Sequence, residues 1–224
     1  AFGGGKYPTT RLIDLLEYAD AFSKRIDVPH QELLGRKILM EFDPTCDYEE
    51  IVEDFAKEAL ANLEPTYIFT SSNSTVHQSL AEQRTIKFFL MSISASTPKT
   101  MAENEIVLPA QSTSLILDSL NKILETHTSA NVFLVFDNLS ELLMSVGFDN
   151  AYKFLIYMMD MLFSGRTTDL FLFNPSAHEP TVVSQIRGIF SNILTYEKNR
   201  LNIVKRFSDS SKIGLIELHT ISSG

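Results

Sequence analysis

The chain has 224 residues, of which 44% are hydrophobic and 21% charged, so it can form one large domain or two small ones, and wholesale disorder is excluded. The net charge of −9 disfavours a domain that binds nucleic-acid phosphates, and the single cysteine, Cys46, excludes a disulfide framework or a cysteine-rich zinc site. Because no apolar run reaches the ~18 residues of a membrane helix and no basic-then-apolar leader opens the chain, we expect a cytoplasmic protein with no membrane partner.

The first 34 residues divide into two predicted parts. Residues 1–10 contain three consecutive glycines and no apolar periodicity, which indicates a flexible tail. Residues 11–34 form a predicted N-terminal helical arm, with an amphipathic helix over 11–26 in which Leu12, Leu15, Leu16, Ala19 and Phe22 recur at three- and four-residue spacings. The arm either packs on its own domain or contacts another protein.

Residues 35–224 read as one domain in which strands and helices alternate. Apolar runs predict strands over 37–42, 66–70, 86–93, 131–136 and 170–173, and three- to four-residue spacings predict helices over 47–62, 113–125, 151–163 and 181–194. Residues 94–105 read as irregular, and strands over 201–204 and 213–218 close the chain as a hairpin. This alternation predicts an α/β fold with a mainly parallel sheet, and strands 37–42 and 131–136 are central because both of their faces are apolar.

The start of the helix over 47–62 has its own local signal. Asp47 followed three residues later by Glu50 fits a capping box with Asp47 as the cap. In the helix over 151–163, three methionines indicate either a core helix packed on the sheet or an adaptable subunit contact.

Two segments resemble the RecA-type ATPases, and most closely the KaiC/RadA-like branch common in archaea. The segment GRKILMEFDPTCDYEEIVEDFAKEAL (35–60) stands where that family has a strand, the Walker A loop and a helix, and NVFLVFDNLSELL (131–143) resembles its Walker B strand, which ends here in Asp137. The tail also resembles the family's final hairpin, with Lys205-Arg206-Phe207 in place of the Lys-x-Arg element that reaches a neighbour's nucleotide. The resemblance implies a three-layer RecA-like αβα fold with a C-terminal β-hairpin.

The phosphate loop departs from the family. A Walker A loop needs glycines whose amides wrap the phosphates, a Lys for the β- and γ-phosphates, and a Ser or Thr for Mg²⁺. The residues that stand in its place contain neither Gly nor Lys: Asp43, Pro44, Thr45, Cys46, Asp47, Tyr48, Glu49 and Glu50. The family's catalytic Glu after the second strand is also missing, since residues 71–75 carry no acid. We therefore expect no catalytic residue and no nucleotide cofactor.

Two alternatives remain open for the acidic residues at the strand ends. Asp43 and Asp137, with or without Glu41, could hold Mg²⁺ or Ca²⁺ through oxygen ligands. In the simpler interpretation, Asp137 caps the turn that follows its strand.

The sequence thus favours a non-catalytic RecA/KaiC-like domain, a pseudo-ATPase that acts as a regulatory or scaffolding module through protein contacts. The alternative is a nucleotide- or metal-binding switch, or an ATPase, that uses an atypical loop. Expected partners are another protein or a second copy of the chain, without nucleic acid. For assembly we expect a monomer or a small nucleotide-independent oligomer, most simply a dimer.

Overall fold

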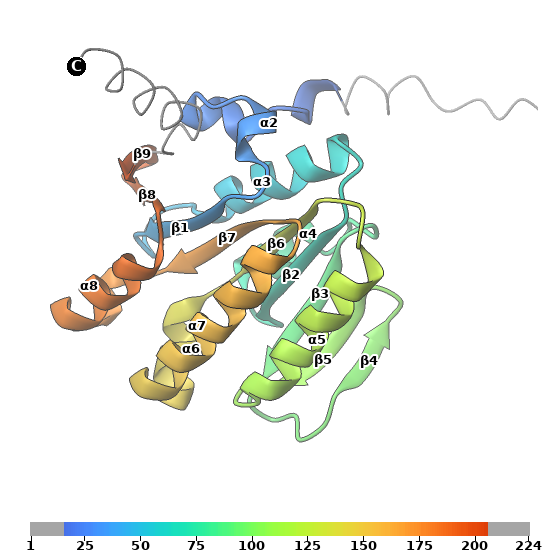
Figure 1. Ribbon diagram of the computed structural model, residues 1–224, viewed down its shortest axis with the longest axis vertical. Coiled ribbons are helices and arrows are strands. Elements are labelled where there is room, and N and C mark those ends of the chain that lie inside the picture. Colours follow the sequence, from blue (N-terminus) through green and yellow to red (C-terminus); the bar gives the residue numbers. More distant parts are fainter. Residues whose placement is uncertain (1–15, 206–224) are drawn as a thin grey trace, which may run out of the picture.

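The computed structural model describes residues 16–205, and in this part of the chain the fold is built on one nine-stranded sheet (Figure 1). The strands lie in the order β4-β5-β3-β2-β6-β7-β1-β8-β9. Their bounds are β1 (Lys37–Phe42), β2 (Thr66–Ser71), β3 (Lys87–Ser92), β4 (Lys99–Ala102), β5 (Glu105–Pro109), β6 (Val132–Phe136), β7 (Thr167–Phe173), β8 (Asn192–Glu197) and β9 (Arg200–Lys205). All neighbours pair in parallel except β4 with β5 and β8 with β9.

Helices cover both faces of the sheet. One face carries α3 (Glu49–Ala61), α4 (Thr75–Leu80) and the short η1 (Ser23–Ile26) and α2 (His30–Leu33). The other face carries α5 (Thr113–Thr126), α6 (Leu139–Val146), α7 (Phe148–Ser164) and α8 (Pro180–Ile189). A short 3₁₀-helix, η2 (Pro175–Ala177), precedes α8. Each face has its own apolar core, because alternate residues of a strand point to opposite sides. In β1, for example, Leu39 joins one core while Ile38 and Met40 join the other.

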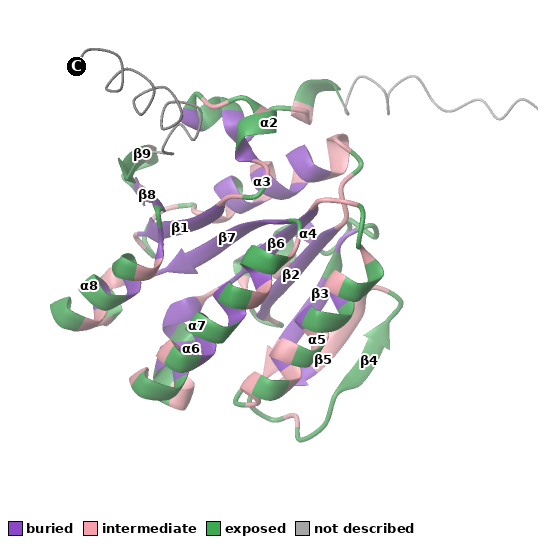
Figure 2. Cartoon of the chain, in the orientation of Figure 1, coloured by how far each residue is buried: buried purple, intermediate pink, exposed green. Residues whose placement is uncertain are grey.

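The prediction that strands 37–42 and 131–136 are central is confirmed. β6 pairs with β2 and β7, and β1 pairs with β7 and β8, all in parallel. Every residue of both strands is buried (Figure 2), as expected of strands covered on both faces by helices. The expected α/β class with a mainly parallel sheet is therefore confirmed.

The C-terminal hairpin exists, but it uses a different first strand. The prediction of a helix over 181–194 is wrong after Ile189, because α8 ends there and β8 begins at Asn192. β8 pairs antiparallel with β9, and Lys198 and Asn199 turn the chain with φ of 51° and 57°, as a tight two-residue hairpin requires. The predicted partner strand over 213–218 lies outside the described residues.

At the opposite edge, the prediction of an irregular segment over 94–105 is also wrong. β4 lies inside it and pairs with β5 to form the outermost hairpin of the sheet. All four residues of β4 are exposed, so the strand lacks the apolar pattern that marks the others.

The described part of the N-terminal arm packs on its own domain. Residues 23–26 form a 3₁₀-helix rather than the end of an α-helix, and Phe22 and Ile26 are buried against the core that includes α3. The fully buried carboxylate of Glu58 accepts hydrogen bonds from the amides of Phe22 (2.7 Å) and Ser23 (2.8 Å) and pairs with His30 (2.7 Å). The predicted tail over 1–10 and the first residues of the arm lie outside the described part. Among the described residues, no helix is long and apolar enough to cross a membrane.

Candidate functional site

A cleft of about 450 Å³ opens at the carboxyl ends of the parallel strands. Its walls come from the loop after β1, the start of α4 after β2, the start of α6 after β6 and the segment after β7. Ligands of open α/β sheets bind in this position, where loops from adjacent strands diverge. The cleft therefore contains the degenerate phosphate loop that the sequence singles out, and it is the candidate functional site.

The backbone of the phosphate-loop segment is hydrogen-bonded to itself. The Thr45 amide donates to the Asp43 carboxylate (2.9 Å), and the Cys46 amide donates to the Asp43 carbonyl (3.0 Å). The Tyr48 amide donates to the Cys46 carbonyl (2.8 Å), and the Glu50 amide to the Asp47 carbonyl (3.2 Å). A phosphate-binding loop leaves such amides free to point at the anion. In this loop these four donors are already used.

The prediction that Asp47 caps the helix is wrong. α3 begins at Glu49, its N-cap residue is Tyr48, and no side chain bonds to the amides of its first turn. The backbone carbonyls of Asp47 and Tyr48 accept from the amides of Glu50 and Ile51 instead. The capping-box pattern is present in the sequence, but the tight turn of the loop satisfies the same donors.

Tyr48 fills the base of the loop. Its ring stacks on Phe42 with centroids 4.1 Å apart, and Tyr48 lines the cleft together with Thr75 at the start of α4. Burial, with a further contribution from the Asp137 carboxylate, raises the pKa of Tyr48 to about 12. The phenol is therefore neutral at physiological pH.

Asp137 is buried at the end of β6 and connects that strand to β2 and α4. Its Oδ2 accepts hydrogen bonds from Thr70 Oγ1 (2.6 Å) and from Ser74 Oγ. Burial raises the pKa of Asp137, and the hydrogen bonds from Ser74 and Thr70 oppose that rise. The interpretation of Asp137 as a turn cap is wrong, because it is Asn138 whose side chain accepts from the Glu141 amide (2.9 Å) and caps α6.

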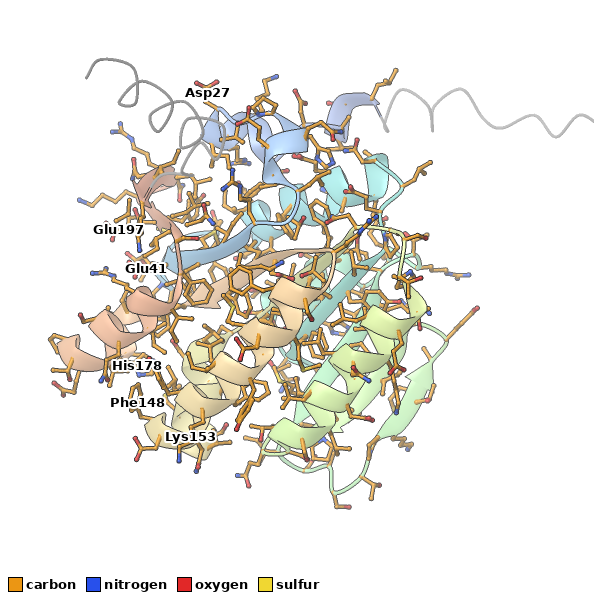
Figure 3. The ribbon with its side chains drawn as sticks, in the orientation of Figure 1. Asp27, Glu41, Phe148, Lys153, His178 and Glu197 are labelled. Atoms are coloured by element: carbon orange, nitrogen blue, oxygen red, sulfur yellow. The ribbon has the colours of Figure 1, made fainter. Side chains whose placement is uncertain are left out.

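The structure does not bring the candidate metal ligands together. Glu41, labelled in Figure 3, lies in β1, and both of its carboxylate oxygens accept hydrogen bonds from Arg187 of α8, at 2.6 and 2.7 Å. Asp43 accepts from Thr45, which lowers its pKa, while Asp137 lies two strands away across β7, about 10 Å at the usual strand spacing. Within residues 16–205, no group of three or more His, Cys, Asp or Glu side chains is placed to hold a metal ion.

The C-terminal hairpin contacts the loop, which the sequence does not indicate. The Lys198 amide, in the turn of the hairpin, donates to Cys46 Sγ (3.1 Å). Lys205, the first residue of the Lys-Arg-Phe element, donates to the Phe190 carbonyl of its own chain (2.9 Å). Arg206 and Phe207 lie outside the described residues.

Sequence reasoning also missed the polar residues of the far wall. The Asn174 amide donates to Ser140 Oγ (2.9 Å), which ties the end of β7 to the start of α6. Glu141 faces the cleft, and its pKa is raised by burial and by the Asp137 charge. The sequence could have indicated these residues by their position after apolar strands, because the carboxyl ends of parallel strands meet at one edge of the sheet.

Comparison with known proteins gives matches only among solved structures. No protein-family model and no curated protein matches the chain. A structure from a study of PH0250 of Pyrococcus horikoshii OT3 superposes with a TM-score of 0.57 at 11% identity, covering 79% of this chain and 89% of that one. The flagellar accessory protein FlaH of Methanocaldococcus jannaschii matches with a TM-score of 0.49 at 19% identity, covering 84% of each chain, and this weaker likeness carries no argument. At 11% identity the first likeness concerns the fold alone, which here is an α/β fold with a mainly parallel sheet and a C-terminal hairpin.

Proposed function

We propose that this chain is a non-catalytic RecA/KaiC-like domain, a pseudo-ATPase that acts as a regulatory or scaffolding module through contacts with proteins. The observation that carries the proposal is the closed loop after β1. Its Thr45, Cys46, Tyr48 and Glu50 amides donate within the segment, and Pro44 has no amide hydrogen to offer. Binding a triphosphate there would require breaking these bonds and opening the loop.

The charge of the cleft supports the same conclusion. Asp47, Glu49 and Glu141 line it, and no Lys or Arg is among its described lining residues. A triphosphate placed there would lie near several like charges, each costing on the order of 1 kcal/mol at about 5 Å even in water.

The test is a binding experiment with the intact chain. Calorimetric titration with ATP, ADP and GTP, each with and without Mg²⁺, should give no affinity tighter than roughly millimolar, equivalent to about −4 kcal/mol. A thermal-shift screen with the same ligands and with Ca²⁺ provides a second readout, because a ligand at 100 times its Kd adds ~2.7 kcal/mol of stability.

A matched variant separates charge from loop geometry. Glu49→Gln combined with Glu141→Gln removes two cleft charges and leaves the loop amides closed, so it should bind ATP no better than roughly millimolar. Micromolar binding of ATP to the unmodified chain, or ATP hydrolysis above background, would refute the proposal and favour the nucleotide-binding alternative.

A further inference from the structure

The outward face of α7 exposes apolar side chains, and of these Phe163 lies under the Lys37 ammonium, with Nζ 5.8 Å from the ring centroid. Ile156, Tyr157 and Phe163 are 39%, 66% and 64% exposed, although they belong to a helix whose other face is fully packed. Figure 2 shows the exposed residues along the outward side of α7. With the exposed charges Lys153 and Asp160, they follow the three- and four-residue spacing of a single helix face, here called the α7 stripe.

The methionines of this helix do not form the stripe. Met158 and Met159 are buried in the core against the sheet, so the interpretation of α7 as a core helix is correct for them. The exposed apolar surface comes from residues that sequence reasoning did not single out.

The two charges of the α7 stripe make it complementary to itself. Lys153 and Asp160 are seven residues apart, about two helical turns, and Ile156 and Tyr157 lie midway between them. If two α7 helices pack antiparallel about a two-fold axis at that midpoint, Lys153 of each copy lies opposite Asp160 of the other. In the part of the chain that the structure describes, neither Lys153 nor Asp160 forms an ion pair.

We propose that the α7 stripe is a contact between two copies of this chain, related by a two-fold axis between Ile156 and Tyr157. Two inter-subunit ion pairs flank an apolar centre in this arrangement, and the symmetric contact closes as a dimer. A different partner is less well matched, because the stripe carries one charge of each sign and offers no net charge to attract an acidic or a basic surface. The contact shares no residue with the cleft, so it does not depend on the proposed pseudo-ATPase function.

The dimensions of the stripe set the strength of the contact. A helix of 17 residues is about 25 Å long, so α7 alone offers less than the ~800 Å² per partner of a standard interface. The net charge of −9 on each copy also opposes association at low salt. The dimer is therefore weak, with a dissociation constant in the micromolar to millimolar range.

The experiment is sedimentation velocity on the intact chain from about 1 µM to about 1 mM, supported by light scattering. The unmodified chain should show a concentration-dependent dimer. Lys153→Asp or Asp160→Lys places like charges opposite each other twice in the symmetric contact, and each should weaken association by about tenfold or more. Lys122→Asp, at an exposed position of α5 outside the stripe, is the control and should leave the association unchanged.

A mixture of the two reversed variants provides the decisive result. One copy then carries Asp at positions 153 and 160 and the other carries Lys at both, so the antiparallel geometry predicts a heterodimer although each variant alone is monomeric. The doubly exchanged variant, K153D with D160K, should regain the homodimer. Circular dichroism establishes that every variant is folded. A monomeric unmodified chain at the highest concentration, a dimer that survives either reversal, or a mixture that stays monomeric would each overturn the proposal.

Discussion

A buried ion pair joins the starts of two central strands and permits a quantitative prediction. Lys37 of β1 and Asp169 of β7 are register partners, 3% and 0% exposed, with Nζ 2.9 Å from Oδ2. Lys37 also donates to the carbonyl and hydroxyl oxygens of Thr167 at 2.5 and 2.8 Å, while no described group bonds to the other Asp169 oxygen. The pair is thus isolated from solvent, and either charge depends on the other for compensation.

The expected effect is large for single substitutions and small for the pair. Lys37→Met leaves the Asp169 carboxylate uncompensated, and Asp169→Val does the same to the ammonium group, so each should destabilise the fold by about 3–5 kcal/mol. The double variant removes both charges and should lie within about 1 kcal/mol of the unmodified protein or above it, because two desolvation costs disappear together. The coupling energy of this cycle is therefore about 5 kcal/mol or more.

Urea unfolding followed by circular dichroism measures these differences. Each single variant should lower the midpoint by ~1 M or more if the urea dependence is about 3 kcal/mol per molar. Lys122→Met is the matched control, because Lys122 and Asp118 are 71% and 55% exposed at 2.7 Å and their pair should contribute less than about 1 kcal/mol. A single Lys37→Met variant that costs under ~1 kcal/mol, or a double variant as unstable as the singles, would refute the reasoning.

Three further predictions concern buried ionisable groups. Glu58→Gln replaces one carboxylate oxygen by a donor amide, so it should lower the free energy of unfolding by about 2 kcal/mol and speed hydrogen exchange at the Phe22 or Ser23 amide. Unchanged exchange at both amides would contradict the hydrogen bonds from these amides to Glu58. Tyr48 should ionise near its raised pKa of about 12 in an ultraviolet titration; Tyr48→Phe should remove that transition, and ionisation near pH 10 would contradict the buried environment. Burial raises the pKa of Asp169 from 3.8 to about 6, although the Lys37 charge opposes that rise. The folded chain therefore binds this proton more tightly than the unfolded chain does. The stability that this group contributes is complete below pH 3.8 and is lost as pH rises through about 6. The double Lys37→Met and Asp169→Val variant should therefore lose less stability across this window, and an identical pH slope would count against the assignment.

The sequence determined the central strands and the class of fold. β6 is an unbroken apolar run and β1 is apolar except for Lys37 and Glu41, and such runs have few alternatives in a chain where strands and helices alternate. The missing Gly and Lys after β1 were equally visible, because a phosphate loop requires those residue types whatever the tertiary structure. The elements near the sheet edges were harder to predict from the sequence. β4 is entirely exposed and so has no apolar pattern. The apolar residues before β8 continue the helical spacing of α8 until the chain pairs with β1.

Only the tertiary structure decided which polar groups meet. Asp47 and Glu50 form a capping pattern, yet the helix starts at Glu49 because the closed loop satisfies its first amides by backbone carbonyls. Lys37 and Asp169 are far apart in sequence, and only the parallel pairing of β1 with β7 places them in contact. Local patterns report burial and turn chemistry within a few residues, whereas the partners of buried charges and of the loop are set by strand register and helix packing across the whole sheet.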